Sequence, residues 1–355
     1  MDLAFAATVE ADSVSPDGFR LTTFEATYPR IVHSEMMTHR VFSRNSASTR
    51  AIPIATQLNN LLTNPFIPEV FGINQPGMQA YRHLSGLKHD KAVEIWLAGR
   101  DRAVTTVLEL ILGTDITGDL LSYEPNREFV AADIILEEFK EITRLLPKST
   151  DDIDLDDTGI LNVHKQLAGR GLEAYMWHTI VLTGTEFDNF FALRDHPEAQ
   201  GEIATIARAM REAYDESVPK ELGYGDWHLP YVDEGEFSDT FDAIRSSAAR
   251  AAAASYGRQR NKNPVKELER YEDLRSGGHM SPLEHQATPI SQDEWALRSH
   301  GASEIQNFAP TLDSIDDLTV SQLVGSLEFS GNLRGWHPHR KDVPHEDNFG
   351  TLREE

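Results

Sequence analysis

The sequence of 355 residues contains no cysteine. This absence excludes disulfides, thiolate metal sites and every reaction that needs a sulfur nucleophile. No uncharged apolar run reaches the roughly 18 residues of a membrane-spanning helix, and Met1-Asp2-Leu3 lacks the basic region that opens a secretory signal. We therefore expect a globular protein of the cytoplasm with no membrane partner.

Positive charge is scarce: 33 lysines and arginines stand against 57 aspartates and glutamates, for a formal net charge of -24. Such a field repels the phosphate backbone of a polynucleotide, and we expect no polynucleotide partner. A single phosphate is different, because two or three arginines in one pocket can hold it bidentately. The charge thus leaves a mononucleotide as a possible ligand.

Hydrophobic patterning predicts an α+β fold with long helices packed on a mixed or antiparallel sheet. Residues 6–28, with Ser15-Pro16-Asp17-Gly18 as turn, predict a hairpin. The segment after Pro29 predicts a helix that ends near His39, and the proline- and glycine-rich stretch 53–76 predicts an irregular loop. Helical spacing or propensity predicts helices in four later segments: 89–113, 129–146, 197–214 and 248–254.

Residues 38–50 pack three arginines, several hydroxyls and an amide into one short segment with few apolar side chains. Guanidinium groups offer planar donor forks, and serine hydroxyls with loop N–H groups can complete a phosphate shell. Composition alone slightly favours a surface turn with incidental arginines. The order of the residues is more informative.

This stretch is similar to the signature of flavin-dependent thymidylate synthases, R-H-R-x-x-S-x-N-x-x-S-x-R. Six of the seven signature positions match, namely His39, Arg40, Ser43, Asn45, Ser48 and Arg50. Thr38 replaces the first arginine, and Ser46 stands where many members carry a glutamate. The conventional thymidylate synthase attacks the pyrimidine with a cysteine, which this chain lacks.

The resemblance implies roles for the residues of this segment. His39, Arg40 and Val41 face the flavin, whereas Ser48 and Arg50 hold the phosphate and sugar of the nucleotide. Two further candidates for substrate binding are weaker. They are Glu35, which together with His33 precedes the signature, and Arg170, which lies in a segment similar to a helix of the family.

A second match covers residues 189–194, which resemble the N-F-x-x-L-R motif of the family and are followed at the right spacing by A-Q-x-E-I. The resemblance implies that Arg194 reaches the pyrimidine edge and polarises the ring, and that Asn189 contacts flavin. Standing alone, this motif would favour an arginine that caps an ordinary amphipathic helix.

A third match is residues 278–285, similar to the family's G-H-x-S-P-x-E-H. His279, Ser281 and Glu284 would contact flavin, as would Ser255 upstream. Read without the family, the two histidines of this motif with a glutamate between them suggest a metal. Pro282 argues against one, because it disrupts the helix that closely spaced ligands prefer.

The order of the motifs departs from the family, in which G-H-x-S-P-x-E-H comes shortly before the arginine-rich signature. Here it follows much later, which predicts a rearranged or circularly permuted single domain over 1–345, with a helical insertion at about 80–150 and a polar tail at 346–355. Residues 330–336 are then expected to lead back to the start of the helix at Arg30.

Two other polar segments invite metal readings that the sequence does not favour. In one register the run Asp151–Asp157 lacks the glycine that a calcium loop requires, and in the other register the required glutamate is missing. A solvated acidic loop is therefore the better interpretation. His337, His339 and His345 stand among proline and basic residues, so we expect an exposed polar segment there.

The resemblance implies transfer of a one-carbon unit from methylenetetrahydrofolate to dUMP, giving dTMP, with FAD as cofactor and NADPH as hydride donor. It also implies a homotetramer with active sites shared between subunits. Two alternatives remain open. One is an enzyme of the same fold that uses dCMP or delivers hydroxymethyl, and the other is a catalytically inactive nucleotide-binding protein.

Overall fold

The computed structural model describes residues 3–49, 51–77, 80–115, 117, 137, 139–141, 160–254, 256–257, 262–291, 332–344 and 346. Several predictions therefore fall outside the described residues: Arg50, Ser255, His345 and the acidic run 151–157. Of the helix predicted over 129–146, only residues 137 and 139–141 are described, and they are helical.

The described residues contain the predicted hairpin at the centre of a mixed sheet. Strands β1 (Ala6–Val14) and β2 (Arg20–Pro29) pair antiparallel, and Gly18 allows the turn between them by taking a positive φ of 83°. β2 also pairs with β4 (Trp177–Gly184), β4 pairs with β3 (Ser43–Ser46), and the short β5 (Lys220–Glu221) adds to β1 in parallel. The strand order is β3-β4-β2-β1-β5.

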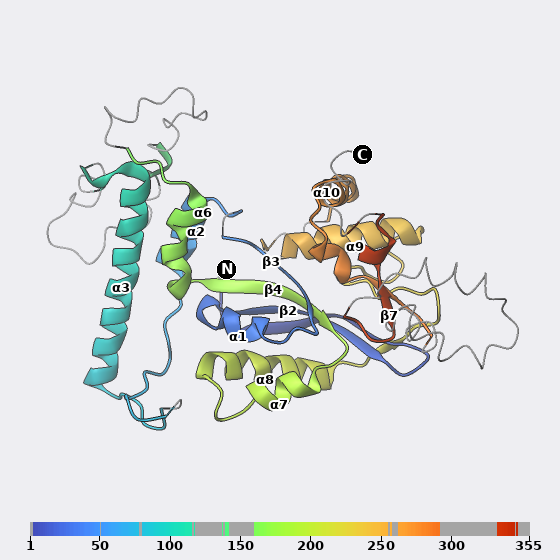
Figure 1. Ribbon diagram of the computed structural model, residues 1–355, viewed down its shortest axis with the longest axis horizontal. Coiled ribbons are helices and arrows are strands. Elements are labelled where there is room, and N and C mark those ends of the chain that lie inside the picture. Colours follow the sequence, from blue (N-terminus) through green and yellow to red (C-terminus); the bar gives the residue numbers. More distant parts are fainter. Residues whose placement is uncertain are drawn as a thin grey trace, which may run out of the picture.

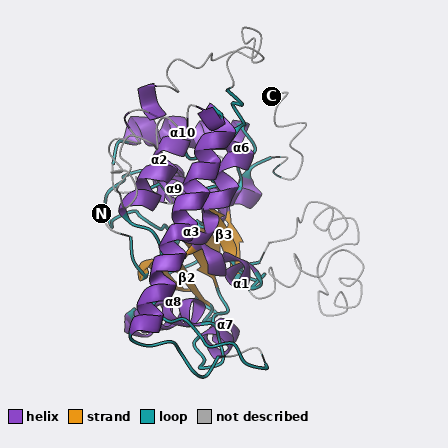
Figure 2. Ribbon diagram, turned by 90° about the vertical axis from the view of Figure 1, so that its left-hand side faces the viewer, coloured by secondary structure: helices purple, strands orange, loops and turns teal. Residues whose placement is uncertain are grey.

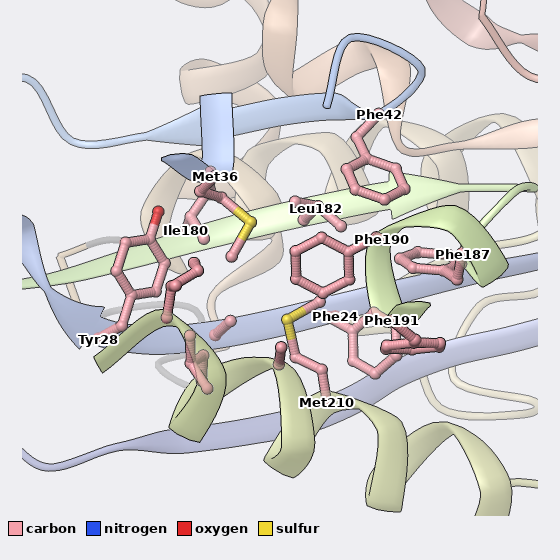
Figure 3. Packing of buried hydrophobic residues seen from close by; sticks show 14 of the residues in the cluster. Phe24, Tyr28, Met36, Phe42, Ile180, Leu182, Phe187, Phe190, Phe191 and Met210 are labelled. Carbon is pink, nitrogen blue, oxygen red and sulfur yellow. The ribbon is translucent and has the colours of Figure 1, made fainter. Parts of the chain in front are cut away.

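Helices cover both faces of this sheet (Figure 1). Helices α7 (Asp188–Arg194) and α8 (Gly201–Glu216) lie on one face, and α9 (Thr240–Ala254) with α10 (Pro264–Ser276) on the other. Because side chains alternate along a strand, one face of the sheet contributes aromatic and aliphatic residues to the main core. Figure 3 shows this core, which includes Phe24, Phe42, Phe190 and Met210.

Helix α8 begins at Gly201, four residues later than the predicted start at Pro197. The residues before it form a tight turn in which the N–H of Ala199 donates to the carbonyl of His196 at 2.9 Å. Gln200 is then extended, with ψ at 140°, so the helix cannot start earlier. The predicted helix over 248–254 is confirmed as the last part of α9.

A helical lobe with its own apolar core stands at one end of the sheet (Figures 1 and 2). It contains α2 (Ile54–Thr63), the long α3 (Leu87–Leu112), α6 (Lys165–Ala168) and a 3-10 helix at Gly169–Tyr175. The prediction of α3 is confirmed. The loop predicted over 53–76 is wrong for its first half, because α2 buries one apolar side.

Short elements close the fold around these layers. The chain after Pro29 forms a 3-10 turn at Arg30–Val32 and then α1 (His33–Met37), so the helix predicted there is confirmed but short. A 3-10 turn at Ser281–Glu284 precedes β6 (Ala287–Pro289), which pairs with β7 (Trp336–Pro338), and a 3-10 helix at His339–Asp342 follows. None of the described helices combines the length and apolarity needed to cross a bilayer.

Two predictions about the C-terminal segment are wrong. His339 is buried and hydrogen-bonds the Tyr271 hydroxyl at 2.8 Å, and His337 lies 2.7 Å from Asp342. These contacts and the pairing of β7 with β6 hold the segment against the protein, so it is no exposed polar segment. The polar tail predicted at 346–355 lies outside the described residues except for Glu346. Residues 332–336 also do not lead to Arg30. Trp336 donates to the carbonyl of Phe19, at the opposite end of β2.

Candidate functional site

The candidate site lies along β3, the strand at one edge of the described sheet. Residues 38–49 run from the end of α1 along this strand, and β3 pairs with β4 from Ser43 opposite Thr183 to Ser46 opposite Ile180. An edge strand is accessible along one side. Polar groups of the arginine-rich signature are therefore presented at the margin of the sheet, where other segments of the chain reach them.

The first contact joins the signature to the N-F-x-x-L-R motif. Arg194, the last residue of α7, donates from Nε to Nε2 of His39 at 3.0 Å and from Nη2 to the Thr38 hydroxyl at 3.0 Å. These residues are about 155 positions apart in sequence. The predicted neighbourhood of His39 and Arg194 is therefore present in the structure.

The His39 ring is fixed by this contact and by aromatic packing. It is buried, stacks on Phe42 with centroids 6.0 Å apart, and meets the edge of Phe190 at 5.0 Å. A guanidinium can only donate, so Nε2 of His39 is an acceptor and the ring proton lies on Nδ1. Burial lowers the pKa of His39, and the positive charges of Arg194 and Arg44 lower it further.

The second contact joins β3 to the G-H-x-S-P-x-E-H motif, about 236 residues away. Asn45 donates to the carbonyl of Ala251 on α9 at 3.0 Å and accepts from the Ser281 hydroxyl at 3.3 Å. Thus Ser281 and Asn45 hydrogen-bond each other directly. His279 stands two residues before Ser281 and is exposed.

Glu284, the third flavin candidate of that motif, is held by a residue that the sequence did not single out. Arg340, from the C-terminal 3-10 helix, donates from Nη1 to the Glu284 carboxylate and from Nε to Glu346 at 2.5 Å. Lys341 also pairs with Glu346. No sequence signal predicts this pairing, because Arg340 lies 56 residues from Glu284 in a segment without a motif.

The last residue of the same motif, His285, has a structural role inside the protein. It forms one end of a buried hydrogen-bonded chain that passes through Thr183, Thr23 and His228 to Ser13, with distances of 2.6–2.9 Å. Burial lowers the pKa of His228 and of His285 to about 3, so both rings are neutral. His285 and the exposed His279 therefore occupy different environments.

Arg170, a weaker candidate for substrate binding, belongs to a separate group near the other end of β3. Arg170 is exposed and pairs with Glu173 at 2.8 Å, and the same carboxylate accepts from the Thr49 hydroxyl at 3.2 Å. Thr49 follows Ser48 directly. Arg30 lies 3.3 Å from Glu173 as well.

Not every candidate is brought into contact with another. Glu35 touches the first group through its backbone carbonyl, which accepts from Thr38 at 2.6 Å, whereas its carboxylate accepts from Ser34. Asn189 is exposed on the first turn of α7. Arg40 and Val41 are exposed between α1 and β3, where the side chain of Asn332 donates to the Arg40 carbonyl at 3.5 Å.

Exposed apolar side chains surround the contact between Arg194 and His39. Met37, Val41 and Leu193 are 41%, 48% and 54% exposed, and each is within two residues of one of these partners. A hollow of about 430 Å³ elsewhere, between β1 and residues 225–240, is lined by acidic groups and by none of the predicted site residues. The candidate site is thus an open edge with apolar neighbours.

Comparisons with known proteins add a similarity to solved structures. No protein-family model matches the chain, and no curated protein does. The chain is similar to the crystal structure of the UMP/dUMP methylase PolB from Streptomyces cacaoi bound with 5-Br UMP, with 18% sequence identity over 60% of this chain and 90% of that chain, and a TM-score of 0.33. A TM-score of this size does not establish a shared fold, so the residues of the chain must support any proposal of function.

Proposed function

We propose that this protein is an FAD-dependent enzyme that transfers a one-carbon unit from methylenetetrahydrofolate to C5 of dUMP and produces dTMP. The observation that carries the proposal is the meeting of three distant segments along β3. Arg194 bonds His39, and Ser281 bonds Asn45. Each pair joins two motifs that resemble flavin-dependent thymidylate synthases, and incidental sequence similarity gives no reason for these motifs to meet.

Arg194 is suited to stabilise negative charge on a pyrimidine ring. Its side chain is half-buried, and no carboxylate among the described residues neutralises it. Its Nη1 group forms no hydrogen bond within the described part of the chain, so a donor remains for a ligand. A positioned positive charge lowers the energy of a developing anion most effectively where water is excluded.

The residues around β3 fit a flavin in their chemistry. An isoalloxazine ring system needs an apolar or aromatic surface together with hydrogen-bonding groups along its polar edge. His39, through Nδ1, and Arg40 supply donors, and Ser281, whose proton is engaged by Asn45, offers its lone pairs. Val41 adds an exposed apolar side chain. When bound, FAD supplies the redox step that reduces the transferred carbon with electrons from NADPH. The protein provides position and charge, and no cysteine is required.

The phosphate and sugar of the substrate are assigned to Ser48 and Arg50, and Arg170 is a weaker candidate for contact with the nucleotide. In the structure Arg170 pairs with Glu173 on the exposed surface, where an ion pair contributes little stability. A phosphate can therefore recruit this guanidinium at small cost and gain a bidentate contact. Glu35, on α1, completes the substrate residues assigned to this proposal.

A related activity is favoured by two departures from the family signature. Thr38 replaces an arginine, and Ser46 stands in place of a common glutamate. Both changes alter side chains of the candidate site, and they are compatible with dCMP as substrate or hydroxymethyl as the transferred group. The missing first arginine, together with the rearranged order of the motifs, is the reason to keep an inactive nucleotide-binding protein as an alternative.

One experiment separates these activities. Purified protein is examined for flavin absorbance, before and after FAD is added, and is then incubated with methylenetetrahydrofolate, NADPH and either dUMP or dCMP. We expect a yellow protein that converts dUMP to a product heavier by one CH2 unit, since a methyl group replaces the hydrogen at C5. Product from dCMP only, or a hydroxymethyl mass, selects the related activity. Colourless protein that does not bind added FAD selects the inactive alternative.

We also propose that the active form is a homotetramer with shared sites. The apolar side chains of Met37, Val41 and Leu193 next to Arg194 and His39 support this assembly, because a second subunit would cover them and exclude water. Light scattering of the purified protein should give four times the 39.8 kDa chain mass. A monomer that turns over the substrate would contradict the shared site.

A further inference from the structure

Thr38 occupies the one signature position at which the chain departs from the seven defined residues. Its hydroxyl lies at the end of α1 and makes two hydrogen bonds: it donates to the carbonyl of Glu35 at 2.6 Å and accepts from Nη2 of Arg194 at 3.0 Å. A hydroxyl has one proton, and that proton is engaged by the carbonyl. Its lone pairs are therefore directed to the guanidinium, which has only donors.

The second anchor of Arg194 is His39. Nε and Nη2 lie on the same edge of a guanidinium, and here they meet His39 and Thr38 respectively. Both acceptors are neutral, since the pKa of His39 is lowered by burial and by nearby positive charge. The side edge of the guanidinium is thus fixed, while its end, with donors on Nη1 and Nη2, and its full positive charge stay available for a ligand.

An arginine at position 38 would be incompatible with this arrangement. It offers no acceptor to Nη2 of Arg194 and brings a like charge to the same exposed place, which disfavours the contact. The threonine therefore does more than remove a family residue, because its hydroxyl provides the acceptor that holds Arg194.

We propose that Thr38 is a positioning residue that aims the free fork of Arg194 at the substrate. The proposal rests on the proposed function of the site. Thr38 itself does not touch the substrate. It acts with His39 to fix one rotational state of the guanidinium before the ligand arrives, which is how preorganised donors contribute to catalysis.

Three substitutions at this exposed position test the proposal. Thr38→Val keeps the shape and removes the hydroxyl, Thr38→Ser keeps the hydroxyl, and Thr38→Arg restores the family residue. Loss of one hydrogen bond to a charged group should lower kcat for T38V by about 10- to 100-fold, with the KM for nucleotide and the affinity for FAD close to those of the wild type. T38S should stay within about threefold of the wild type, since its hydroxyl can make the same bonds.

T38R gives the sharpest contrast. If Thr38 positions Arg194, the kcat of T38R should fall at least as much as that of T38V. Turnover by T38R above that of the wild type would show that the threonine is a defect and would overturn the proposal. A T38V enzyme within twofold of the wild type would overturn it as well.

Crystal structures of the ligand-free variants keep the test independent of activity. In T38S the guanidinium of Arg194 should stay on His39, and in T38V it should leave this position or lose its density. An unchanged guanidinium in T38V would overturn the positioning role even if the enzyme works as proposed. If the wild-type protein neither binds FAD nor converts a nucleotide, the proposed function fails, but the structures still decide whether Thr38 orients Arg194.

Discussion

Two arginines, on helices that cover opposite faces of the sheet, are held in opposite ways. Arg194 uses its Nε and Nη2 groups on two neutral acceptors and meets no carboxylate among the described residues. Arg250, on α9, is 1% exposed, and all five of its N–H donors are engaged by Glu236, Glu267 and the carbonyl of Tyr231. Hydrogen bonds from Arg250 are the main cause that lowers the pKa of Glu236 to about 2.

The difference separates a structural cation from one available for binding. Buried charge is tolerated when it is paired and fully hydrogen-bonded, as at Arg250. An arginine held by neutral groups keeps its charge, and its orientation is set without being neutralised. The partners of an arginine therefore say more about its role than its exposure does, and Arg194 and Arg250 can be tested against each other.

The largest expected effect is the loss of the Arg250 network. Arg250→Ala leaves the buried Glu267 without its cation and leaves Glu236 with Lys262 alone, and it should lower the free energy of unfolding by about 3–5 kcal/mol. Urea denaturation followed by circular dichroism measures it. The matched control is Arg275→Ala, which removes an exposed pair with Glu272 and should cost less than about 1 kcal/mol. Equal losses in the two variants would contradict a structural role specific to Arg250.

Arg194→Ala should show the reverse pattern. Its contacts are few, so the free energy of unfolding should change little, and FAD should still bind. Removal of a charge that stabilises a developing anion should lower kcat by about 100- to 1000-fold. Arg211→Ala, on the neighbouring α8 with an exposed ion pair, serves as control and should turn over normally. Unchanged turnover in Arg194→Ala would remove the assigned role.

Local pattern predicted those parts of the fold that depend on neighbouring residues. The hairpin follows from the turn around Gly18, and α3 follows from its helical spacing, because both signals lie within one segment. The segment at α2 was misjudged, since proline and asparagine at its ends outweighed the apolar side formed by Ile54, Leu58 and Leu61. Such a helix is stabilised by the lobe it packs into rather than by its own sequence.

The site residues also divide into those that a local motif identified and those whose contacts depend on distant segments. Motif spacing brought His39, Arg194 and Ser281 forward as candidates, and the structure shows each bonded to another motif. The pairing of Arg340 with Glu284 depends on how the C-terminal segment returns beside the sheet, and no short-range pattern encodes that path. The burial of His339 was missed for the same reason, because its partner Tyr271 lies 68 residues earlier.

A smaller effect should arise from crowding the aromatic support of His39. A Cβ atom at Gly184 would lie 2.6 Å from the ring of Phe42, which stacks on His39. Gly184→Ala should therefore displace Phe42 and cost about 1–3 kcal/mol of stability, with weaker turnover but no disturbance at Arg250. Gly171→Ala, where nothing lies within 4 Å of the added atom, is the control. If both variants have equal stability, Phe42 is free to move aside.

The smallest expected effect concerns the proton on His39. Burial is the main cause that lowers its pKa below the ordinary value of 6.5, and Arg194 adds to it. A lowered pKa means that the folded protein binds this proton less readily than the unfolded chain does. The contribution of neutral His39 to stability is therefore complete above pH 6.5 and decreases as the pH falls from there towards the folded pKa.

Removal of the Arg194 charge should move this titration only part of the way back. In Arg194→Gln the pKa of His39 should rise but stay below 6.5, because the ring remains buried between Phe42 and Phe190. Histidine ring signals followed by NMR against pH, assigned with His39→Gln, measure the change. A wild-type His39 that titrates at 6.5 or above would mean that Nε2 carries a proton near neutral pH, and Arg194 would then lack one of its two neutral anchors.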